Sequence, residues 1–324
     1  MDKNKFLISH VAGGGSARNY YRLQTPESKC LICISEDTNE NVAFVRLTEY
    51  LKMKGVNVPE IYSVSEDKTS YLLEDLGDRN LLDFILQERP REVLWDVLEK
   101  VISGLVYIQT LPPAEWGTIV DFEPFGKELI EFDLNYVKVN FFEALKIGYD
   151  EWLLKKEFEK LRDTLLSYPQ ENRGLMYRDF QSRNILLVDS ENTPYYIDYQ
   201  SARKGPGIYD LVSFAWQAKA AFSTAERERV TEIYIKEYGK RGIYIEKAVK
   251  ENIEYFAIFR ILQTLGAYGR RGLKEGKRHF IESIPYAVEN LSFLLEKENM
   301  AREFPELHHL IEKIRSGAIP LSED

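Results

Sequence analysis

The chain has 324 residues, of which 44% are hydrophobic and 13% aromatic, so it is too apolar to be disordered and long enough for one large domain or two ordinary ones. Its 52 acidic residues outnumber 43 basic ones, and the net charge of −9 argues against general nucleic-acid binding, which needs a positive face. No apolar run has the length of a membrane span, and the first residues lack the apolar core of a signal peptide. We therefore expect a soluble, cytoplasmic protein that binds neither nucleic acid nor membrane.

Residues 1–76 have the pattern of a β-rich lobe with one helix. Short apolar runs between turn-forming residues predict strands at 20–23, 30–34, 61–64 and 70–74. An apolar stripe over 42–51 predicts a helix that Asn39 or Asn41 caps and Gly55 ends. Cys30 and Cys33 fall within a predicted strand, which favours buried thiols over a redox or zinc site.

The rest of the chain, residues 77–324, is mostly helical in pattern. Apolar residues spaced three and four apart predict helices at 81–86, 93–108, 125–145 and 152–166, and again from about 209 onward. Because strands and helices are segregated, we predict an α+β fold with two lobes, residues 1–76 and 77–324. A cleft between such lobes is a natural ligand site.

One predicted hairpin, with strands at 185–188 and 195–197, interrupts the helical part. Centred near Glu191, it would place Asn184 opposite Asp198. An amide oxygen and a carboxylate at one point suit Mg²⁺ beside a polyphosphate, because Mg²⁺ keeps its other positions for water and phosphate oxygens.

Asp179 precedes Asn184 by five residues, so one loop would hold its carboxylate near that end of the hairpin. A carboxylate beside the metal, without necessarily binding it, suits a base that accepts a hydroxyl proton during phosphoryl transfer. Protein kinases use an Asp, an Asn and a later Asp in the same order. The alternative is an ordinary loop in which Asp179 and Asn184 form turns; the spacing of all three residues, with Asp198, favours the catalytic interpretation.

A glycine run precedes the first predicted strand. Gly13, Gly14 and Gly15 would let the backbone approach a phosphate and offer its N–H groups, while Ser16 adds a hydroxyl and Arg18 a charge. Taken alone, the run is equally consistent with a flexible turn.

These motifs together resemble the aminoglycoside-phosphotransferase-like branch of the protein-kinase-like superfamily. The resemblance extends over most of the chain and includes Leu-Glu-Asp-Leu-Gly-Asp at 73–78 and Gly-Pro-Gly-Ile-Tyr-Asp at 205–210. Arg-Ile-Leu-Gln-Thr-Leu-Gly-Ala-Tyr at 260–268 resembles, more specifically, the cell-wall kinases that phosphorylate the anomeric hydroxyl of N-acetylmuramate and N-acetylglucosamine.

The resemblance implies a bilobal kinase-like fold, ATP and Mg²⁺ as cofactors, and an adenine-binding hinge made by backbone groups of Glu74, Asp75 and Leu76. It also implies that Asp210 braces the catalytic loop, whereas its position before an apolar run suggests a helix N-cap. The two roles are compatible.

The sequence departs from the family pattern at two points. Tyr177 replaces the usual His before Arg-Asp, and the third strand holds no Lys, with only Lys29 at its start. Arg18, Arg22 or Arg46 is a candidate replacement for that phosphate-binding Lys. Its usual helical partner is either Glu40 or Glu49.

The resemblance places the acceptor pocket in residues 121–150. Its polar residues are Asp121, Glu123, Glu128, Glu131, Asp133, Asn135, Tyr136 and Lys138. They suit a cationic acceptor such as an aminoglycoside or a choline-like molecule, or they form the wet face of an amphipathic helix, which we favour. For the carboxylate of N-acetylmuramate, Arg183 or Arg260 is a candidate ligand.

We predict an ATP-dependent small-molecule kinase whose acceptor is an amino sugar. The alternative from another class is a pseudokinase, which binds a nucleotide but has no activity. The missing Lys favours that alternative, whereas the presence of Asp179, Asn184 and Asp198 opposes it.

Overall fold

The computed structural model describes residues 7–11, 18–120 and 122–317. By packing, the chain divides into two compact units. Unit 1 combines Met1–Phe122 with Tyr177–Lys204, and unit 2 combines Glu123–Met176 with Gly205–Asp324. The predicted boundary after residue 76 separates the chain by secondary structure rather than by packing, and it stays a prediction.

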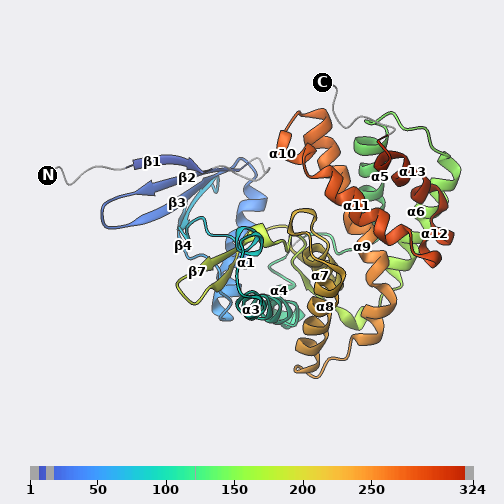
Figure 1. Ribbon diagram of the computed structural model, residues 1–324. Coiled ribbons are helices and arrows are strands. Elements are labelled where there is room, and N and C mark those ends of the chain that lie inside the picture. The colour runs from blue at the N-terminus through green and yellow to red at the C-terminus, as the bar shows by residue number, and fades with distance from the viewer. Residues whose placement is uncertain (1–6, 12–17, 121, 318–324) are drawn as a thin grey trace. The chain divides into compact units, whose positions relative to one another are not determined.

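Unit 1 contains an antiparallel five-stranded sheet, drawn in blue and cyan in Figure 1. Its strand order is β1 (Leu7–Val11), β2 (Asn19–Gln24), β3 (Lys29–Ile34), β5 (Ser70–Glu74) and β4 (Ile61–Val64). The four predicted strands are confirmed, whereas β1 was missed by the sequence patterns. Cys33 is buried in β3, and burial raises the pKa of its thiol, as expected of an inert side chain.

The helix of this lobe, α1 (Thr38–Met53), is capped differently from the prediction. Asp37 is the N-cap, and its carboxylate accepts a hydrogen bond from the Glu40 N–H. Asn41 is instead buried inside the helix, where its amide donates to the carbonyls of Ser35 and Lys68. The predicted end of the helix is confirmed, because Gly55 follows it with a φ of +76°.

The predicted hairpin is present and is part of unit 1. Its strands are β7 (Ile185–Val188) and β8 (Thr193–Tyr196). The Leu187 N–H donates to the Arg79 carbonyl at 2.8 Å, and the Tyr196 N–H donates to the Asn57 carbonyl at 2.9 Å. These two hydrogen bonds join the hairpin to the segment before β4, which contains Asn57, and to the segment after β5, which contains Arg79. The helices of unit 1 after the sheet are α2 (Leu81–Leu86), α3 (Arg91–Gln109) and α4 (Pro113–Trp116).

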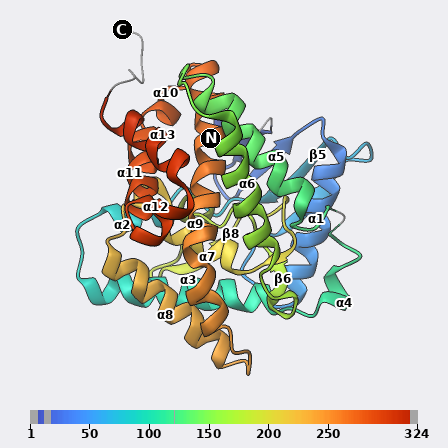
Figure 2. The ribbon, with the colours of Figure 1, turned by 90° about the vertical axis from the view of Figure 1, so that its right-hand side faces the viewer.

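Unit 2 is built around one long helix, α9 (Glu246–Tyr268), against which four other helices pack. Figure 2 shows α9 with α5 and α6 on one side and α11 to α13 on the other. The further helices and strands of unit 2 are α5 (Lys127–Val137), α6 (Glu151–Leu166), β6 (Arg173–Met176), α7 (Ile208–Ala215), α8 (Thr224–Gly239), α10 (Arg278–Ile281), α11 (Ile284–Leu295), α12 (Glu298–Glu303) and α13 (Pro305–Arg315). The strand β9 (Arg203–Pro206) begins in unit 1 and ends in unit 2.

The predicted helix over 125–145 is shorter than expected. After α5, the chain continues as a π-helical segment, η1 (Lys138–Phe142), and a second one, η5 (Gly269–Lys274), follows α9. The two segments pack together because Gly269 lacks a side chain: a Cβ there would lie 2.1 Å from the Asn140 carbonyl oxygen. The Lys274 ammonium bridges the pair by donating to the Val139 carbonyl and the Asn140 side chain.

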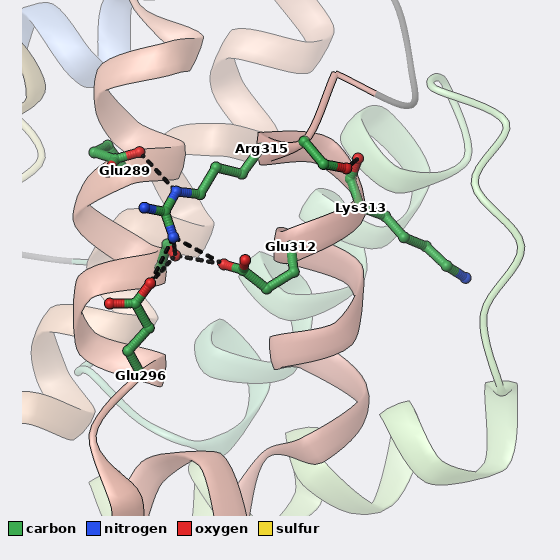
Figure 3. A network of polar contacts seen from close by, with 7 residues as sticks. Glu289, Glu296, Glu312, Lys313 and Arg315 are labelled. Atoms are coloured by element: carbon green, nitrogen blue, oxygen red, sulfur yellow. Dashed lines mark hydrogen bonds and ion pairs between the residues drawn. The ribbon is translucent and has the colours of Figure 1, made fainter.

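The last helix, α13, is attached to unit 2 at both of its ends. At its start, the buried Glu157 carboxylate accepts hydrogen bonds from the N–H groups of Glu306 and Leu307. At its end, Arg315 lies among the carboxylates of Glu289, Glu296 and Glu312, as Figure 3 shows. Within the described residues, no helix is both long and apolar enough to cross a membrane.

Candidate active site

The β7–β8 hairpin differs from its predicted register by one residue. Ile185 pairs with Tyr196, and the Ile197 N–H donates to the Asn184 carbonyl at 3.0 Å. Asn184 therefore lies opposite Ile197, and the predicted pairing with Asp198 is wrong. The register is set at the turn, where Val188 pairs with Thr193 and residues 189–192 form the loop. Asp198 itself has a φ of +67° and leaves the extended conformation.

The side chains of Asn184 and Asp198 nevertheless meet. The Asn184 Nδ2 lies 3.0 Å from the Asp198 Oδ2 and 2.9 Å from the Asp179 carbonyl oxygen. Because both neighbours are acceptors, the amide nitrogen must face them, and the Asn184 Oδ1 points elsewhere. The other carboxylate oxygen of Asp198, Oδ1, accepts from Gln200 Nε2 at 3.0 Å. One amide thus joins the loop that carries Asp179 to the residue that follows the hairpin.

Asp179 is half-buried, and its Oδ2 accepts a hydrogen bond from the Ser201 hydroxyl at 3.1 Å. Arg178 before it has a φ of +76°. Positive φ at a non-glycine residue costs on the order of 1–3 kcal/mol and persists where surrounding contacts enforce it. One such residue, Arg178, precedes Asp179, and the other is Asp198 itself. Strained backbone of this kind clusters at functional sites.

A column of aromatic rings packs next to the residues of this site and was not predicted. Phe44 of α1 stacks between Tyr71 of β5 and Tyr199, with centroid distances of 5.2 Å on each side. Tyr199 follows Asp198, and its ring meets the edge of Tyr177, two residues before Asp179, at 5.8 Å. The Tyr199 hydroxyl also hydrogen-bonds to Thr48 at 2.7 Å. The sheet, the helix and the loop that carries Asp179 therefore share one core, which includes the Tyr177 ring.

The structure distinguishes among the candidate phosphate-binding arginines. The Arg18 guanidinium forms an ion pair with Glu40 of α1 at 2.6 Å, and its side chain is only 2% exposed. Arg46 and Glu49 are exposed on the same helix. Gly13, Gly14, Gly15 and Ser16, which precede Arg18, lie outside the described residues.

Arg22 is bound to the segment that was predicted to be the hinge. Its guanidinium donates to both carboxylate oxygens of Asp75, at 2.7 and 3.0 Å, and to both of Asp78, at 2.9 and 2.8 Å. The hydrogen bond from Arg22 holds the pKa of the Asp78 carboxyl below its usual value. The hinge residues Glu74 and Leu76 flank Asp75, and the Glu74 Oε2 accepts from the Glu60 N–H.

The N-cap assignment of Asp210 is wrong. Gly207 is the N-cap of α7, and Asp210 is a buried residue in the first turn. That turn carries the positive end of the helix dipole, which stabilises a carboxylate. The role of Asp210 as a brace of the predicted catalytic loop stays a prediction.

Arg183, a candidate ligand for the carboxylate of N-acetylmuramate, is exposed.

The motif at 260–268 forms a polar network inside unit 2. The buried Arg260 guanidinium donates to Ser213 at 3.0 Å, Gln263 at 2.6 Å and Thr264 at 2.8 Å. Gln263 in turn donates to the buried carboxylate of Asp133 in α5 at 3.2 Å. The motif thus joins helices α5, α7 and α9, and Arg260 is engaged with its protein partners.

Comparisons with known proteins agree with this geometry. Residues 8–247 match the model of the phosphotransferase enzyme family. The N-acetylmuramate/N-acetylglucosamine kinase of Neisseria meningitidis serogroup B is 25% identical over 93% of this chain and 88% of its own. The protein of that name from Pseudomonas aeruginosa is 23% identical over 95% of this chain and 88% of its own.

A solved structure shows the same fold. Spectinomycin phosphotransferase, crystallised with ADP and spectinomycin, superposes with a TM-score of 0.54 at 16% identity, over 90% of this chain and 93% of that one. The predicted α+β, protein-kinase-like fold is therefore confirmed. With its family model covering most of its length, this chain belongs to the phosphotransferase enzyme family and is an ATP-dependent phosphotransferase that acts on a hydroxyl of a small molecule.

Proposed function

We propose that this enzyme transfers the γ-phosphoryl group of ATP to the anomeric hydroxyl of an amino sugar of the N-acetylmuramate or N-acetylglucosamine type. The observation that carries the chemistry is the Asn184 amide, which bonds at once to the Asp198 carboxylate and to the backbone of Asp179. The acceptor class rests on two relatives that share this name and align along almost the whole chain.

Asp179 is the proposed base. As the hydroxyl oxygen bonds to the γ-phosphorus and the bond to the bridging oxygen breaks, the electron pair leaves with ADP and the hydroxyl proton passes to the Asp179 carboxylate. The hydrogen bond from Ser201 orients that carboxylate. Because the transition state of phosphoryl transfer is loose, most of the rate enhancement would come from positioning and from neutralising charge.

Asn184 and Asp198 fit a magnesium site. Their oxygens are the hard ligands that Mg²⁺ prefers, and the hydrogen bonds of the Asn184 nitrogen leave its oxygen available. When bound there, Mg²⁺ neutralises the charge of the phosphates. The nucleotide would also be held by Gly13, Gly14, Gly15 and Ser16 above the phosphates, by Arg18, and by the backbone of Glu74 and Leu76 at the adenine.

Contacts in the acceptor segment argue against a cationic acceptor. Glu131 is paired with Arg162 at 2.6 Å, and Lys138 with Glu151 at 2.8 Å. Asp133 is buried and accepts from Gln263. Carboxylates that already have protein partners are poor ligands for an aminoglycoside or choline-like cation, because binding the cation would break those contacts.

An acceptor screen tests this proposal. ADP release would be measured with N-acetylmuramate, N-acetylglucosamine, an aminoglycoside, choline and homoserine, together with the methyl glycoside of N-acetylglucosamine, whose anomeric oxygen is blocked. We expect turnover with the two free amino sugars and none with the glycoside. Faster turnover with choline or an aminoglycoside would overturn the acceptor class, and turnover of the glycoside would overturn the anomeric position.

The Arg18–Glu40 ion pair provides a separate prediction. Because Glu40 holds the guanidinium that would bind the phosphates, Glu40→Gln should lower kcat/KM for ATP by about 10- to 100-fold, the range expected for a charge-assisted contact. Glu49→Gln is the matched control, since it makes the same change at an exposed position of the same helix. Equal kinetics in the two variants would exclude Glu40 from nucleotide binding.

A further inference from the structure

We propose that Arg22 is a positioning residue for the nucleotide base: it fixes the shape of the segment after β5 that binds adenine. This inference rests on the proposed nucleotide site and adds to it a side chain that is not expected to touch the ligand. The alternative use of Arg22, as a phosphate ligand, is disfavoured because its donors are engaged with two carboxylates.

The geometry of the contact is unusually complete. The Asp75 carboxylate accepts hydrogen bonds from Nε and Nη2 of the Arg22 guanidinium. The Asp78 carboxylate accepts hydrogen bonds from Nη1 and Nη2. One planar group therefore binds two carboxylates that are three residues apart in the chain. A planar fork of this kind fixes direction as well as distance, which the ammonium group of a lysine cannot do.

Burial makes this contact difficult to replace. The Asp75 side chain is fully buried, whereas that of Asp78 is 73% exposed. The second cation near Asp75, Lys29, has its Nζ 3.9 Å from the carboxylate, beyond hydrogen-bond distance. A buried carboxylate without its partner would be strongly unfavourable, so Arg22 and Asp75 constrain each other.

The chain turns at Gly77, between Asp75 and Asp78. Gly77 has a φ of +82°, a conformation that glycine adopts without strain, and its N–H donates to the Asp75 Oδ1 at 3.0 Å. Leu76 lies between these fixed points, and within the described part of the chain its N–H has no hydrogen-bond acceptor. A hinge that must offer backbone groups to a base needs this kind of outside support, because its own hydrogen bonds are reserved for the ligand.

Arg22 also links the hinge to the other end of the nucleotide site. It lies on β2, the strand that begins just after Arg18. Arg18, which pairs with Glu40, immediately precedes this strand, and Arg22, which pairs with the hinge, lies within it. The first would act on the phosphates and the second on the base, which gives two separable effects.

Two probes distinguish these effects: adenosine, which has no phosphates, and ATP. In Arg22→Lys, we expect both to bind about tenfold more weakly by calorimetric titration, with KM for ATP raised and kcat almost unchanged. In Glu40→Gln, ATP should bind more weakly while adenosine binds as in the wild type. A general loss of structure in Arg22→Lys would lower kcat as well, whereas the proposed effect on the hinge raises KM for ATP and leaves kcat almost unchanged.

Asp78→Asn keeps the test decisive if Arg22→Lys does not fold, because Asp78 is exposed and the buried Arg22–Asp75 pair stays intact. We expect a smaller but measurable loss of adenosine affinity, of about threefold, with an unchanged melting temperature. Wild-type adenosine affinity in Asp78→Asn, or a loss in Arg22→Lys that is confined to ATP, would overturn the proposal. Both measurements are made without an acceptor, so they stand apart from the outcome of the acceptor screen.

Discussion

Replacing Asp179 by Asn is expected to lower kcat by about 10²- to 10⁴-fold, the usual contribution of a positioned general base. The amide has nearly the shape of the carboxylate and can still accept the hydrogen bond from Ser201. It has no significant basicity, so the hydroxyl proton would have no acceptor at this position. Nucleotide affinity and melting temperature should change little, because the backbone bond from Asn184 to residue 179 is retained.

The measurement is steady-state kinetics with a saturating amino sugar, alongside calorimetric binding of ADP. Asp67→Asn is the matched control, because it makes the same change in the turn between β4 and β5, where Asp67 accepts hydrogen bonds from Ser65 and Thr69. Full activity is expected in the control. Turnover within a few-fold of the wild type in Asp179→Asn would remove Asp179 from the role of base.

Gly269→Ala is expected to be the most destabilising small substitution in unit 2. The added Cβ would lie 2.1 Å from the Asn140 carbonyl oxygen and 3.0 Å from the Phe141 Cα. These are backbone atoms of η1, so no rotamer change can relieve the overlap and the two π-helical segments must separate. We expect a loss of about 3 kcal/mol in the free energy of unfolding, at the upper end of the range for overpacking.

Gly239→Ala is the control for this variant, because Gly239 ends α8 and no atom lies within 4 Å of an added Cβ. Alanine should be neutral or slightly stabilising there, because it restricts the unfolded chain. Differential scanning calorimetry would compare the two variants. Equal melting temperatures would show that η1 and η5 do not pack as the structure has them.

The proximity of the three candidate site residues was predictable because their geometry is local. Asp179, Asn184 and Asp198 belong to one loop and one short hairpin, so turn chemistry and strand pattern bring them close without knowledge of the remaining fold. The error of one residue in the register arises in the turn, where Val188 pairs with Thr193 and residues 189–192 form the loop. The strand β8 therefore begins two residues earlier than the pattern indicated, because Pro194 and its neighbours have the composition of a turn.

Features that depend on distant segments were not predictable in the same way. The sequence contains three candidate arginines and two candidate glutamates for this pair. The choice of Arg18 and Glu40 depends on how the residue before β2 lies against α1. The aromatic column was not predictable for the same reason, because Phe44 and Tyr199 belong to the two separate chain segments that form unit 1. Asp37 was overlooked as the cap of α1 because the asparagines next to the apolar stripe were equally good candidates.

Binding of Mn²⁺, a spectroscopic substitute for Mg²⁺, tests most directly whether Asp198 binds the metal and Asp179 acts as the base. It is measured by electron paramagnetic resonance in the presence of ADP. We predict that the wild type and Asp179→Asn bind the Mn²⁺–ADP complex with similar affinity. Asp198→Asn should weaken that binding by at least about tenfold, because it removes the only charged oxygen ligand proposed for the metal. Undiminished Mn²⁺ binding in Asp198→Asn, or its loss in Asp179→Asn alone, would contradict the assignment of base and metal ligands.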